Sequence, residues 1–325
     1  MKILFISSSR KGRGISPFIL NQGESIKNNN IQIDYFLISG SGISNYFKSV
    51  FHIRKKLKEN KYDLIHAHYG FSGIVSKLAS SKKLKVVVSF LGDDLEGSVD
   101  RNGNYSLLSK FYVMINKAFA KFFFDFNIVK SDSLSKKIPN VVNKKIIPNG
   151  VDLSKFYPID KVEACNKLNL DSSKTYCLFP SNPNRYVKNY KLFKNAIKLL
   201  KSDVVEVVLK DIKPSEVVYY YNIASVMVLT SLHEGSPNVI KEAMACNCKI
   251  VSTDVGDVRW LLGDNSNAYI AEQKTKDVCS KISLAINEDK KNINLRSRII
   301  ELELDSNIVS EKIIGIYKKV LKINE

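Results

Sequence analysis

The sequence predicts an α/β protein with two doubly wound domains, each a parallel sheet covered by helices. Its 325 residues are more than one ordinary core accommodates. Apolar, strand-like runs alternate with segments of helical periodicity, which is typical of such sheets. The alternation occurs in two series separated by PNGVDLSKFYP, residues 148–158, whose two prolines and one glycine indicate a hinge. We therefore expect one domain at 1–150, a second at 151–306, and a closing helix at 307–325 that packs back toward the first domain.

The first domain is expected to begin with a strand and then to alternate helices and strands. Its expected strands are KILFI (2–6), IQIDYFLI (31–38), DLIHAHY (63–69), KVVVSFL (85–91), FNIVKS (126–131) and KKIIPNG (144–150). Its expected helical segments are 17–28, the basic stretch 45–60, 73–80 and 107–126.

The second domain repeats the same rhythm. Its expected strands are TYCLFPS (175–181), VEVVLK (205–210), VMVLT (226–230) and KIVSTD (249–254). Its expected helices are 191–200, 217–224, one that starts at Pro237, and later ones. The final segment, residues 306–322, has apolar residues at helical spacing with lysines opposite, which predicts an amphipathic helix packed on the body.

The composition is that of a soluble globular protein. The chain is 44% hydrophobic and 25% charged, and no apolar run is long enough to span a bilayer. The start, MKILFISSS, has an apolar run of only Ile3 to Ile6, and no small-residue cleavage site follows it. We interpret it as a buried first strand rather than a signal peptide, and expect a cytoplasmic protein.

Cysteine and histidine show no metal signature. The five cysteines include no CxxC pair, and Cys246 and Cys248 are one residue closer than zinc ligands usually are. His66 and His68 would lie on the same side of a strand, an arrangement that is compatible with a metal. We favour reduced thiols and no metal site.

The positive charge is concentrated in the first half. The formal net charge is +18; residues 1–150 hold 24 Lys and Arg against 10 Asp and Glu, whereas residues 151–325 hold 26 against 22. This asymmetry suggests an anionic partner of the first domain, either a membrane surface, a nucleic acid or a phosphorylated substrate. No nucleic-acid-binding motif accompanies the charge, so we do not expect a nucleic acid.

The stretch EGSPNVIKEAMA, residues 234–245, places a predicted helix start between two carboxylates. Ser236 is a favourable N-cap, Pro237 is a favourable first helical residue, and Gly235 lets a ligand approach the backbone. The first N–H groups of a helix have no partner within it and therefore attract anions. Here they belong to Asn238, Val239 and Ile240.

The two glutamates then fall where the sugars of a nucleotide sugar would lie. Glu242 is about 7–8 Å along the helix axis, a suitable reach from a diphosphate to the adjoining ribose. Glu234 precedes the helix, so it lies on the other side of the phosphates from Glu242, where the transferred sugar would be. The pattern indicates one nucleoside diphosphate sugar across a helix entrance; a capped surface helix with two incidental glutamates is the alternative.

Four segments together resemble family 4 of the retaining glycosyltransferases. EGSPNVIKEAMACNCKIVSTDVGDV (234–258) resembles the donor helix with its E-x7-E element, and IIPNGVDLSKFYP (146–158) resembles the interdomain signature. DLIHAHYG (63–70) and VVSFLGDDL (87–95) resemble two N-terminal strand ends. The resemblance covers nearly the whole chain. It implies the GT-B fold, two Rossmann-like domains facing a central cleft, with the acceptor on the first domain and the nucleotide sugar on the second.

The resemblance also implies roles for individual residues of the second domain. In this family an arginine and a lysine after the first C-terminal strand bind the donor diphosphate, and FPSNPNRYVKNYKLF offers Arg185 and Lys188. Two cations there would stabilise the leaving group. The spacing is shorter than the common form, and the usual glycine–arginine pair is absent. Glu242 would hold the donor ribose and Glu234 a hydroxyl of the transferred sugar, while the backbone from Gly235 to Ile240 would line the phosphates and the sugar.

In the first domain the sequence departs from the family at one position. Many members have a histidine where Leu91 stands, and a leucine cannot donate a hydrogen bond to a sugar hydroxyl. Either Asp93 or Asp94 substitutes for it or the contact is missing, which puts full catalytic competence in question.

Two further groups of the first domain are expected at the ligand side of the sheet. The loop SSSRKGRGISPF precedes a helix capped by Ser16 and Pro17, and lacks the third glycine of a dinucleotide fingerprint. Gly14 and Arg13 are expected on a flexible loop that faces the donor phosphates, with Gly14 binding the donor and Arg13 toward the acceptor side. His68 lies at a strand end, where open α/β sheets bind ligands, and is expected on the acceptor side; a satisfied strand-end histidine is the alternative.

The basic stretch from Tyr46 to Lys61 interleaves aromatic residues with lysine and arginine. This pattern fits a helix at an anionic lipid surface and fits a solvated lysine face equally well. The aromatic run KFYVMINKAFAKFFFDF (110–126) is a candidate for the same face, although much of it could be core.

The predicted function is transfer of a sugar, with retention, from a nucleoside diphosphate sugar to a hydroxyl of a glycan or lipid-linked acceptor. The setting implied by the family is cell-surface polysaccharide or glycolipid synthesis, at the cytoplasmic face of the membrane. We expect no metal and no cofactor besides the donor substrate. The alternatives are a GT-B-type nucleotide-sugar epimerase and a non-catalytic member that binds nucleotide sugar.

Overall fold

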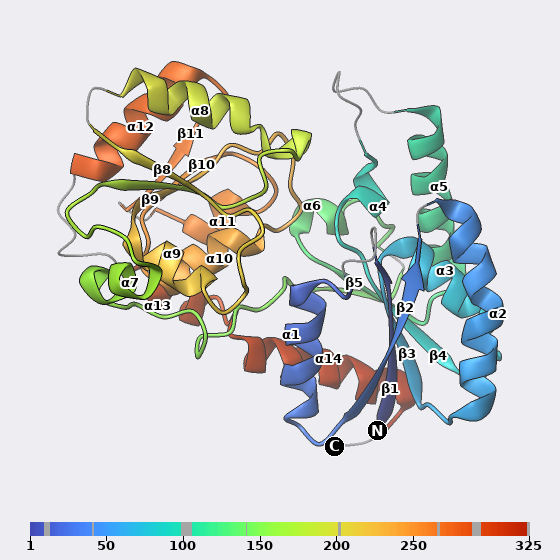
Figure 1. Ribbon diagram of the computed structural model, residues 1–325. Coiled ribbons are helices and arrows are strands. Elements are labelled where there is room, and N and C mark those ends of the chain that lie inside the picture. The colour runs from blue at the N-terminus through green and yellow to red at the C-terminus, as the bar shows by residue number, and fades with distance from the viewer. Residues whose placement is uncertain are drawn as a thin grey trace. The chain divides into compact units, whose positions relative to one another are not determined.

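The chain forms two compact units in the computed structural model (Figure 1), Met1–Gly150 with Ser306–Glu325, and Val151–Asp305. We call them unit 1 and unit 2. The structure describes residues 1–9, 14–40, 42–98, 106–140, 142–200, 203–264, 267–287 and 294–323.

Unit 1 contains a parallel sheet with the strand order β2-β1-β3-β4-β5-β6. Its strands are β1 (Lys2–Ser9), β2 (Gln32–Ser39), β3 (Leu64–His68), β4 (Lys85–Ser89), β5 (Phe126–Val129) and β6 (Lys144–Ile146). Because both faces are covered, strands such as β3 and β5 are buried along their whole length.

Helices cover both faces of the sheet of unit 1. They are α1 (Pro17–Lys27), α2 (Ile43–Glu59), α3 (Gly70–Ala79), α4 (Asp93–Glu96), α5 (Leu107–Phe122), α6 (Asp132–Ser135) and the C-terminal α14 (Ser306–Leu321). One core lies between the sheet and α1 with α14, and the other lies under α2, α3 and α5, as Figure 1 shows.

Unit 2 contains a parallel sheet with the strand order β11-β10-β9-β7-β8. Its strands are β7 (Tyr176–Phe179), β8 (Val205–Val208), β9 (Ala224–Leu229), β10 (Ile250–Thr253) and β11 (Ala268–Ala271). Its helices are α7 (Lys161–Leu168), η1 (Tyr186–Lys188, 3-10), α8 (Tyr190–Leu199), α9 (Val217–Ile223), α10 (Asn238–Ala245), α11 (Val258–Leu262), α12 (Thr275–Asn287) and α13 (Leu295–Glu301). Helices α8 and α12 pack on one face, and α9, α10, α11 and α13 on the other.

Each sheet reverses its winding direction at one point. In unit 1 the first strand, β1, lies between β2 and β3; in unit 2 the first strand, β7, lies between β8 and β9. Open α/β sheets bind ligands at the carboxyl ends of the strands at such switch points. The places to search are therefore the loops that follow β1 and β3, and those that follow β7 and β9.

The chain passes between the units twice, after Gly150 and after Asp305. At these crossings the two segments run together: Val151 N–H donates to the Leu304 carbonyl oxygen at 2.9 Å. A Cβ on Gly150 would lie 2.7 Å from Cα of Ser306, so only glycine allows this approach.

The helix expected over 107–126 is shorter in the structure. It ends at Phe122 because the next residues join the sheet: Asp125 N–H donates to the Val86 carbonyl, and its carboxylate pairs with Lys77 at 2.8 Å and Lys85 at 3.0 Å. The sequence patterns also failed to predict β11 and α7. Helix α7 does carry a start signal, because Asp160 accepts from the N–H groups of Val162 and Glu163.

Across the described ranges, no helix combines the length and the apolar character needed to cross a lipid bilayer.

Candidate functional site

The switch point of unit 2 holds a buried ion pair between Lys188 and Glu234. Lys188 ends η1, after β7, and Glu234 lies in the loop after β9. The ammonium of Lys188 contacts Oε1 of Glu234, and the Ser231 hydroxyl donates to the same oxygen at 2.7 Å. Both charged side chains are largely buried. A buried charge destabilises the fold unless an opposite charge pairs with it. Lys188 and Glu234 therefore compensate each other at the switch point of unit 2.

Threonine hydroxyls that donate to backbone carbonyls fix the loops that carry this pair to one another. The Thr230 hydroxyl donates to the carbonyl oxygens of Lys188 at 3.2 Å and Asn189 at 3.0 Å. From the end of β10, the Thr253 hydroxyl donates to the Ser231 carbonyl at 2.7 Å. The ends of β7, β9 and β10 are thus linked, and Lys188 and Glu234 are held by rigid elements.

Helix α10 starts beside this pair, one residue later than expected. Its N-cap is Pro237, without a side-chain cap bond, and the helix begins at Asn238. Of the three N–H groups expected to face a phosphate, that of Ile240 donates to the Pro237 carbonyl at 3.3 Å. The anion-attracting end of α10 is therefore the turn around Asn238 and Val239.

Ser236 has another partner, which explains why it is not the cap. Its hydroxyl accepts a hydrogen bond from Nζ of Lys241 at 2.8 Å. Lys241 is fully buried, which lowers its pKa to about 8, although Asp257 and Glu242 act in the opposite direction. Burial raises the pKa of Asp257, and the charge of Lys241 offsets only part of this rise. Two buried charged residues, Lys241 and Asp257, thus interact with Ser236 at the start of α10.

Gly256 lets the turn after β10 pass against the loop of Glu234. Its φ is +59°, and a Cβ at this position would lie 2.4 Å from the carbonyl oxygen of Gly235 and 2.7 Å from that of Glu234. The sequence shows a glycine turn here but gives it no role, because the contact joins segments about 20 residues apart. The backbone of Glu234 and Gly235 is therefore set by Gly256 as well as by its own loop.

Glu242 lies on α10 and is tied to α9. Oε2 of Glu242 accepts a hydrogen bond from the Tyr221 hydroxyl at 2.8 Å. Burial raises the pKa of Glu242, while the bond from Tyr221 and the charge of Lys241 lower it. The side chain is thus oriented, with one of its oxygens engaged.

Arg185, the second expected cation, is placed differently from Lys188. It is exposed at the N-cap of η1, and within the described part of the chain its guanidinium makes no ion pair or hydrogen bond. The structure thus brings Lys188 and Glu234 together at the switch point. Arg185, three residues before Lys188 in the sequence, stays on the surface.

In unit 1, His68 lies at the carboxyl end of β3, beside the switch point. It is buried, and neither of its ring nitrogens has a hydrogen-bond partner among the described residues. Burial and the nearby Lys130 lower its pKa to about 3, so the ring is neutral at pH 7. His66 differs, because its ring nitrogens contact the Tyr317 hydroxyl at 2.6 Å and the Ser89 hydroxyl at 2.9 Å.

The loop after β1 is only partly described. Gly14 has a φ of +73°, a backbone conformation that favours glycine. Ser16 is the N-cap of α1 and Pro17 its first residue, although the Ser16 side chain makes no cap bond. Arg13, the other residue expected here, lies outside the described residues.

The two aspartates after β4 differ in role. Asp94 is buried, and its carboxylate accepts from the N–H groups of Gly70 at 3.0 Å, Leu91 at 3.0 Å and Gly92 at 2.9 Å. Burial raises its pKa to about 6 despite these bonds. The Asp94 carboxylate therefore holds the turn after β4, and its expected acceptor role stays a prediction. Asp93 is exposed, and it is the carboxylate of the two that solvent reaches.

No group of three or more His, Cys, Asp and Glu in the described ranges is arranged to hold a metal ion. All five cysteines are described and are free thiols. The rings of His66 and His68 stack with centroids 4.4 Å apart.

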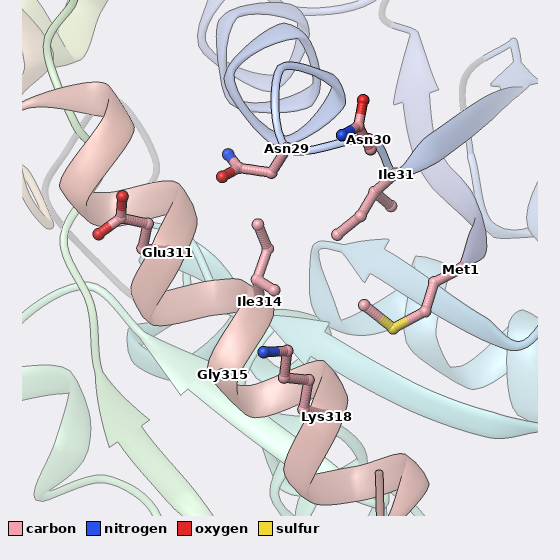
Figure 2. A pocket seen from close by; sticks show the side chains of 8 residues that line it. All are labelled: Met1, Asn29, Asn30, Ile31, Glu311, Ile314, Gly315 and Lys318. Atoms are coloured by element: carbon pink, nitrogen blue, oxygen red, sulfur yellow. The ribbon is translucent and has the colours of Figure 1, made fainter. Parts of the chain in front are cut away.

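A cavity of about 460 Å³ in unit 1 lies away from both switch points (Figure 2). Met1 and Ile31, which precede β1 and β2, place it at the amino-terminal edge of the sheet, where Ile314 and Lys318 of α14 line its other side. Ligands of doubly wound sheets bind at the opposite edge, so this cavity is not the candidate site.

Two protein families match the chain, and between them they take in most of both units. Residues 18–155 match Glycosyltransferase Family 4, and residues 185–302 match the family described as glycosyl transferases group 1. The second range contains Lys188, Glu234 and Glu242.

Curated relatives agree with this assignment. The chain is 25% identical over 318 residues to N,N'-diacetylbacillosaminyl-diphospho-undecaprenol alpha-1,3-N-acetylgalactosaminyltransferase of Campylobacter jejuni, with 85% of this chain and 82% of that protein covered. It is 26% identical over 278 residues to an uncharacterized glycosyltransferase of Methanocaldococcus jannaschii, with 77% and 72% covered.

Solved structures share the fold. Sucrose-phosphate synthase from Thermosynechococcus elongatus superposes with a TM-score of 0.82 at 18% identity, covering 99% of this chain and 100% of that one. Anabaena HepE in complex with UDP superposes with a TM-score of 0.74 at 15% identity, covering 98% and 100%.

The two parallel-sheet units match GT-B structures, and both families that match the chain are glycosyltransferase families. The chain therefore belongs to glycosyltransferase family 4, with the GT-B fold, and is an enzyme that transfers glycosyl groups.

Proposed function

We propose that this glycosyltransferase moves a sugar from a nucleoside diphosphate sugar to a hydroxyl of a lipid-linked or glycan acceptor, with retention of anomeric configuration. The observation that carries the proposal is the buried Lys188–Glu234 pair at the switch point of unit 2, beside the start of α10. A cation, a carboxylate and a helix N-terminus in one place suit a diphosphate joined to a sugar.

In the proposed donor complex, Lys188 and the first turn of α10 bind the diphosphate. The ammonium and the helix N–H groups are already oriented, so they can stabilise the negative charge that grows on the leaving diphosphate. Arg185, being exposed, adds a second positive charge only when its side chain turns toward the phosphates. The proposal requires no cofactor besides the donor substrate.

The two glutamates are proposed to hold the sugars on either side of the phosphates. Glu242 accepts hydrogen bonds from the ribose hydroxyls through the carboxylate that Tyr221 orients. Glu234 accepts from a hydroxyl of the transferred sugar, and Gly235, Ser236 and Pro237 contribute backbone to this wall. When donor phosphate draws Lys188 toward it, the Ser231 hydroxyl keeps Glu234 in position.

The acceptor hydroxyl is proposed to attack from the face that the diphosphate leaves. In this mechanism the departing phosphate oxygen takes the proton of the acceptor hydroxyl, so no protein nucleophile is needed. Asp93 is the carboxylate assigned to the acceptor, since Leu91 lacks a polar group and Asp94 is engaged by backbone. Neutral His68 is assigned to the same side, and the backbone of Gly14 is assigned to the donor phosphates.

Relatives support the substrate classes. The Campylobacter jejuni protein is named for a diphospho-undecaprenol acceptor, and Anabaena HepE has been crystallised with UDP-glucose. We extend the lipid diphosphate acceptor class and the nucleotide donor class to this chain, and we assign its work to cell-surface glycan synthesis at the cytoplasmic side of a membrane. An anionic bilayer surface is then the expected neighbour of the basic unit 1.

The test is a transfer assay with UDP-, GDP- and ADP-sugars and polyprenyl-diphosphate-linked sugar acceptors. The expected result is a new glycosidic bond with the anomeric configuration of the donor, read by NMR, and its loss in Glu234→Ala. An inverted product would contradict retention, and an unchanged rate in Glu234→Ala would remove that residue from the site. Isomerised donor without acceptor would favour an epimerase instead.

A further inference from the structure

Lys241 is a buried charge of α10 that has no part in the donor complex proposed above. Its side chain is 0% exposed, and its ammonium donates a hydrogen bond to the Ser236 hydroxyl at 2.8 Å. Burying an ammonium is unfavourable, and an apolar residue of similar volume would often stabilise the fold as well or better. Ser236 lies two residues after Glu234 in the same loop. Packing alone therefore does not account for a lysine at this position.

Asp257 supplies the opposite charge from the turn after β10. It is 8% exposed, and neither oxygen of its carboxylate has a hydrogen bond of ordinary geometry within the described residues. Burial raises the pKa of Asp257, whereas Lys241 and Ser236 both lower it. Asp257 in turn raises the pKa of Lys241. The Ser236 side chain thus has a buried cation and a buried carboxylate as neighbours.

The bond from Lys241 determines what the Ser236 hydroxyl can do. An ammonium has donors only, so the Ser236 oxygen is the acceptor in this bond. The single proton of the hydroxyl is then directed to another acceptor. Hydrogen bonds in a chain polarise one another, so accepting from an ammonium makes Ser236 a stronger donor. Because Ser236 is only half-buried, an acceptor that does not belong to the chain can reach its hydroxyl.

Ser236 lies where the donor diphosphate is proposed to bind. It directly precedes Pro237, the N-cap of α10, and it follows Gly235 in the loop that carries Glu234. The N–H groups at a helix start attract anions. The Ser236 hydroxyl and the first turn of α10 can therefore bind the same anion.

We propose that Lys241 is a positioning residue of the donor site, which directs the Ser236 hydroxyl toward an oxygen of the donor diphosphate. Ser236 then binds the diphosphate with its side chain as well as its backbone, and Lys241 acts through Ser236 without touching the donor. Asp257 balances the charge of Lys241 when no donor is bound. The inference rests on the proposed function, because it requires the diphosphate to bind at the start of α10.

The first experiment is a double-mutant cycle on nucleoside diphosphate affinity, measured by calorimetry with whichever of UDP, GDP and ADP the wild type binds. Lys241→Met and Ser236→Ala should each weaken binding about tenfold, since an oriented hydrogen bond to a charged group is lost. The double variant should also lose about tenfold, rather than about a hundredfold, because both changes remove the same bond. The cycle thus distinguishes action through Ser236 from a general effect on the loop.

Two further variants separate this role from stability. Lys241→Met leaves the Asp257 carboxylate buried without its counter-charge, so K241M/D257N removes both charges together. That variant should unfold at a higher temperature than Lys241→Met and still bind nucleotide about tenfold more weakly than the wild type. The matched control is Lys249→Met. Lys249 is another buried lysine of unit 2, 2% exposed, and its Nζ donates to the Ala285 carbonyl oxygen at 2.7 Å. This control should bind nucleotide as the wild type does.

The second experiment follows the same affinity from pH 7 to pH 9.5. Burial lowers the pKa of Lys241 to about 8, and a bound diphosphate favours the charged form, so affinity should fall as the pH rises through this value. The charged groups that act on Lys241 are Asp257, from the turn after β10, and Glu242, on α10 itself, and both raise its pKa. Asp257→Asn should therefore move the fall to lower pH, and Lys241→Met should remove it.

The role of Lys241 would be contradicted by multiplicative losses in the double variant, or by an equal loss of affinity in Lys249→Met. A fall of affinity with pH that persists in Lys241→Met would contradict it too. Binding by the wild type with no change in Lys241→Met would overturn this inference alone and leave the donor site standing. Failure of the proposed function is distinguishable: the wild type would then bind none of the three nucleotides, and the role of Lys241 would fall with the donor site.

Discussion

Lys188 and Arg185 are three residues apart, yet their surroundings predict different consequences of removal. Lys188 is buried and paired with Glu234, whereas Arg185 is exposed. We expect Lys188→Ala to lower kcat/KM at least 100-fold, because a fixed charge at the leaving group is lost, and Arg185→Ala to lower it about tenfold or less. Steady-state kinetics with a saturating acceptor measures both. Thermal unfolding of each variant serves as the folding control, and an equal loss in the two would contradict the distinction.

Lys241 predicts a pH dependence of stability. Its pKa is about 8 in the folded chain and 10.5 by reference, so between these values the unfolded chain binds a proton that the folded chain does not. The free energy of unfolding therefore rises with pH in this window, by roughly 3 kcal/mol for the full shift. Lys241→Met should remove that rise.

Urea unfolding of wild type and Lys241→Met at pH 7.5, 9 and 10.5 measures this difference. The wild type should gain stability relative to the variant as the pH increases. Parallel curves for the two proteins would show that Lys241 does not carry the pH dependence.

At the scale of elements, the start of α10 depends on a turn that follows the next strand. Gly256→Ala adds a Cβ within 2.4 Å of the Gly235 carbonyl oxygen at a φ of +59°, so the turn or the Glu234 loop must move. We expect weaker binding of nucleoside diphosphate by at least tenfold in calorimetry, together with a lower unfolding midpoint. The matched control is Gly315→Ala in α14, where a Cβ meets nothing within 4 Å.

Gly315→Ala should stabilise unit 1 by about 0.5–1 kcal/mol, because alanine is the better helix former, and should leave nucleotide affinity unchanged. If Gly256→Ala bound nucleotide as tightly as this control, the turn would not position the donor site.

A buried polar contact ties the C-terminal helix α14 to the sheet of unit 1. The hydroxyl of Tyr317 and Nδ1 of His66 lie 2.6 Å apart, and both groups are buried. Tyr317→Phe leaves a buried ring nitrogen without this partner, which should cost about 1–3 kcal/mol. The unfolding midpoint should fall, while the stabilisation by nucleoside diphosphate, which acts on unit 2, should stay the same. A loss of nucleotide binding in this variant would contradict the separation of the two roles.

At the scale of the whole molecule, the fold was predicted from the alternation of apolar strand-like runs with segments of helical periodicity. The sequence shows two such series, one for each unit. Regular strands such as β1 and β9 were predicted to within a few residues because apolar runs define them. Strand β11 was missed. Local patterns, together with the family resemblance, also predicted a common site for Glu234, Lys188 and Glu242.

The remaining features depend on long-range packing. The sequence shows that Lys241 is a lysine on a helix, but not that it is buried against Ser236 and Asp257. It shows two adjacent aspartates, but not that Asp94 binds three backbone N–H groups while Asp93 is exposed. Likewise Gly256 matters because Gly235 is close in space, and this proximity has no local signature.

The central claim is that the switch point of unit 2 binds the diphosphate of a nucleotide sugar. The most direct test is calorimetric and thermal-shift titration of the full chain with UDP, GDP, ADP and CMP, with and without magnesium. We predict selective stabilisation by one nucleoside diphosphate, equal in both conditions and rising by about 2.7 kcal/mol at a concentration 100 times Kd. Lys188→Ala and Glu242→Ala should weaken it. No response to any of the four nucleotides would contradict the claim and reduce the start of α10 to an ordinary helix terminus.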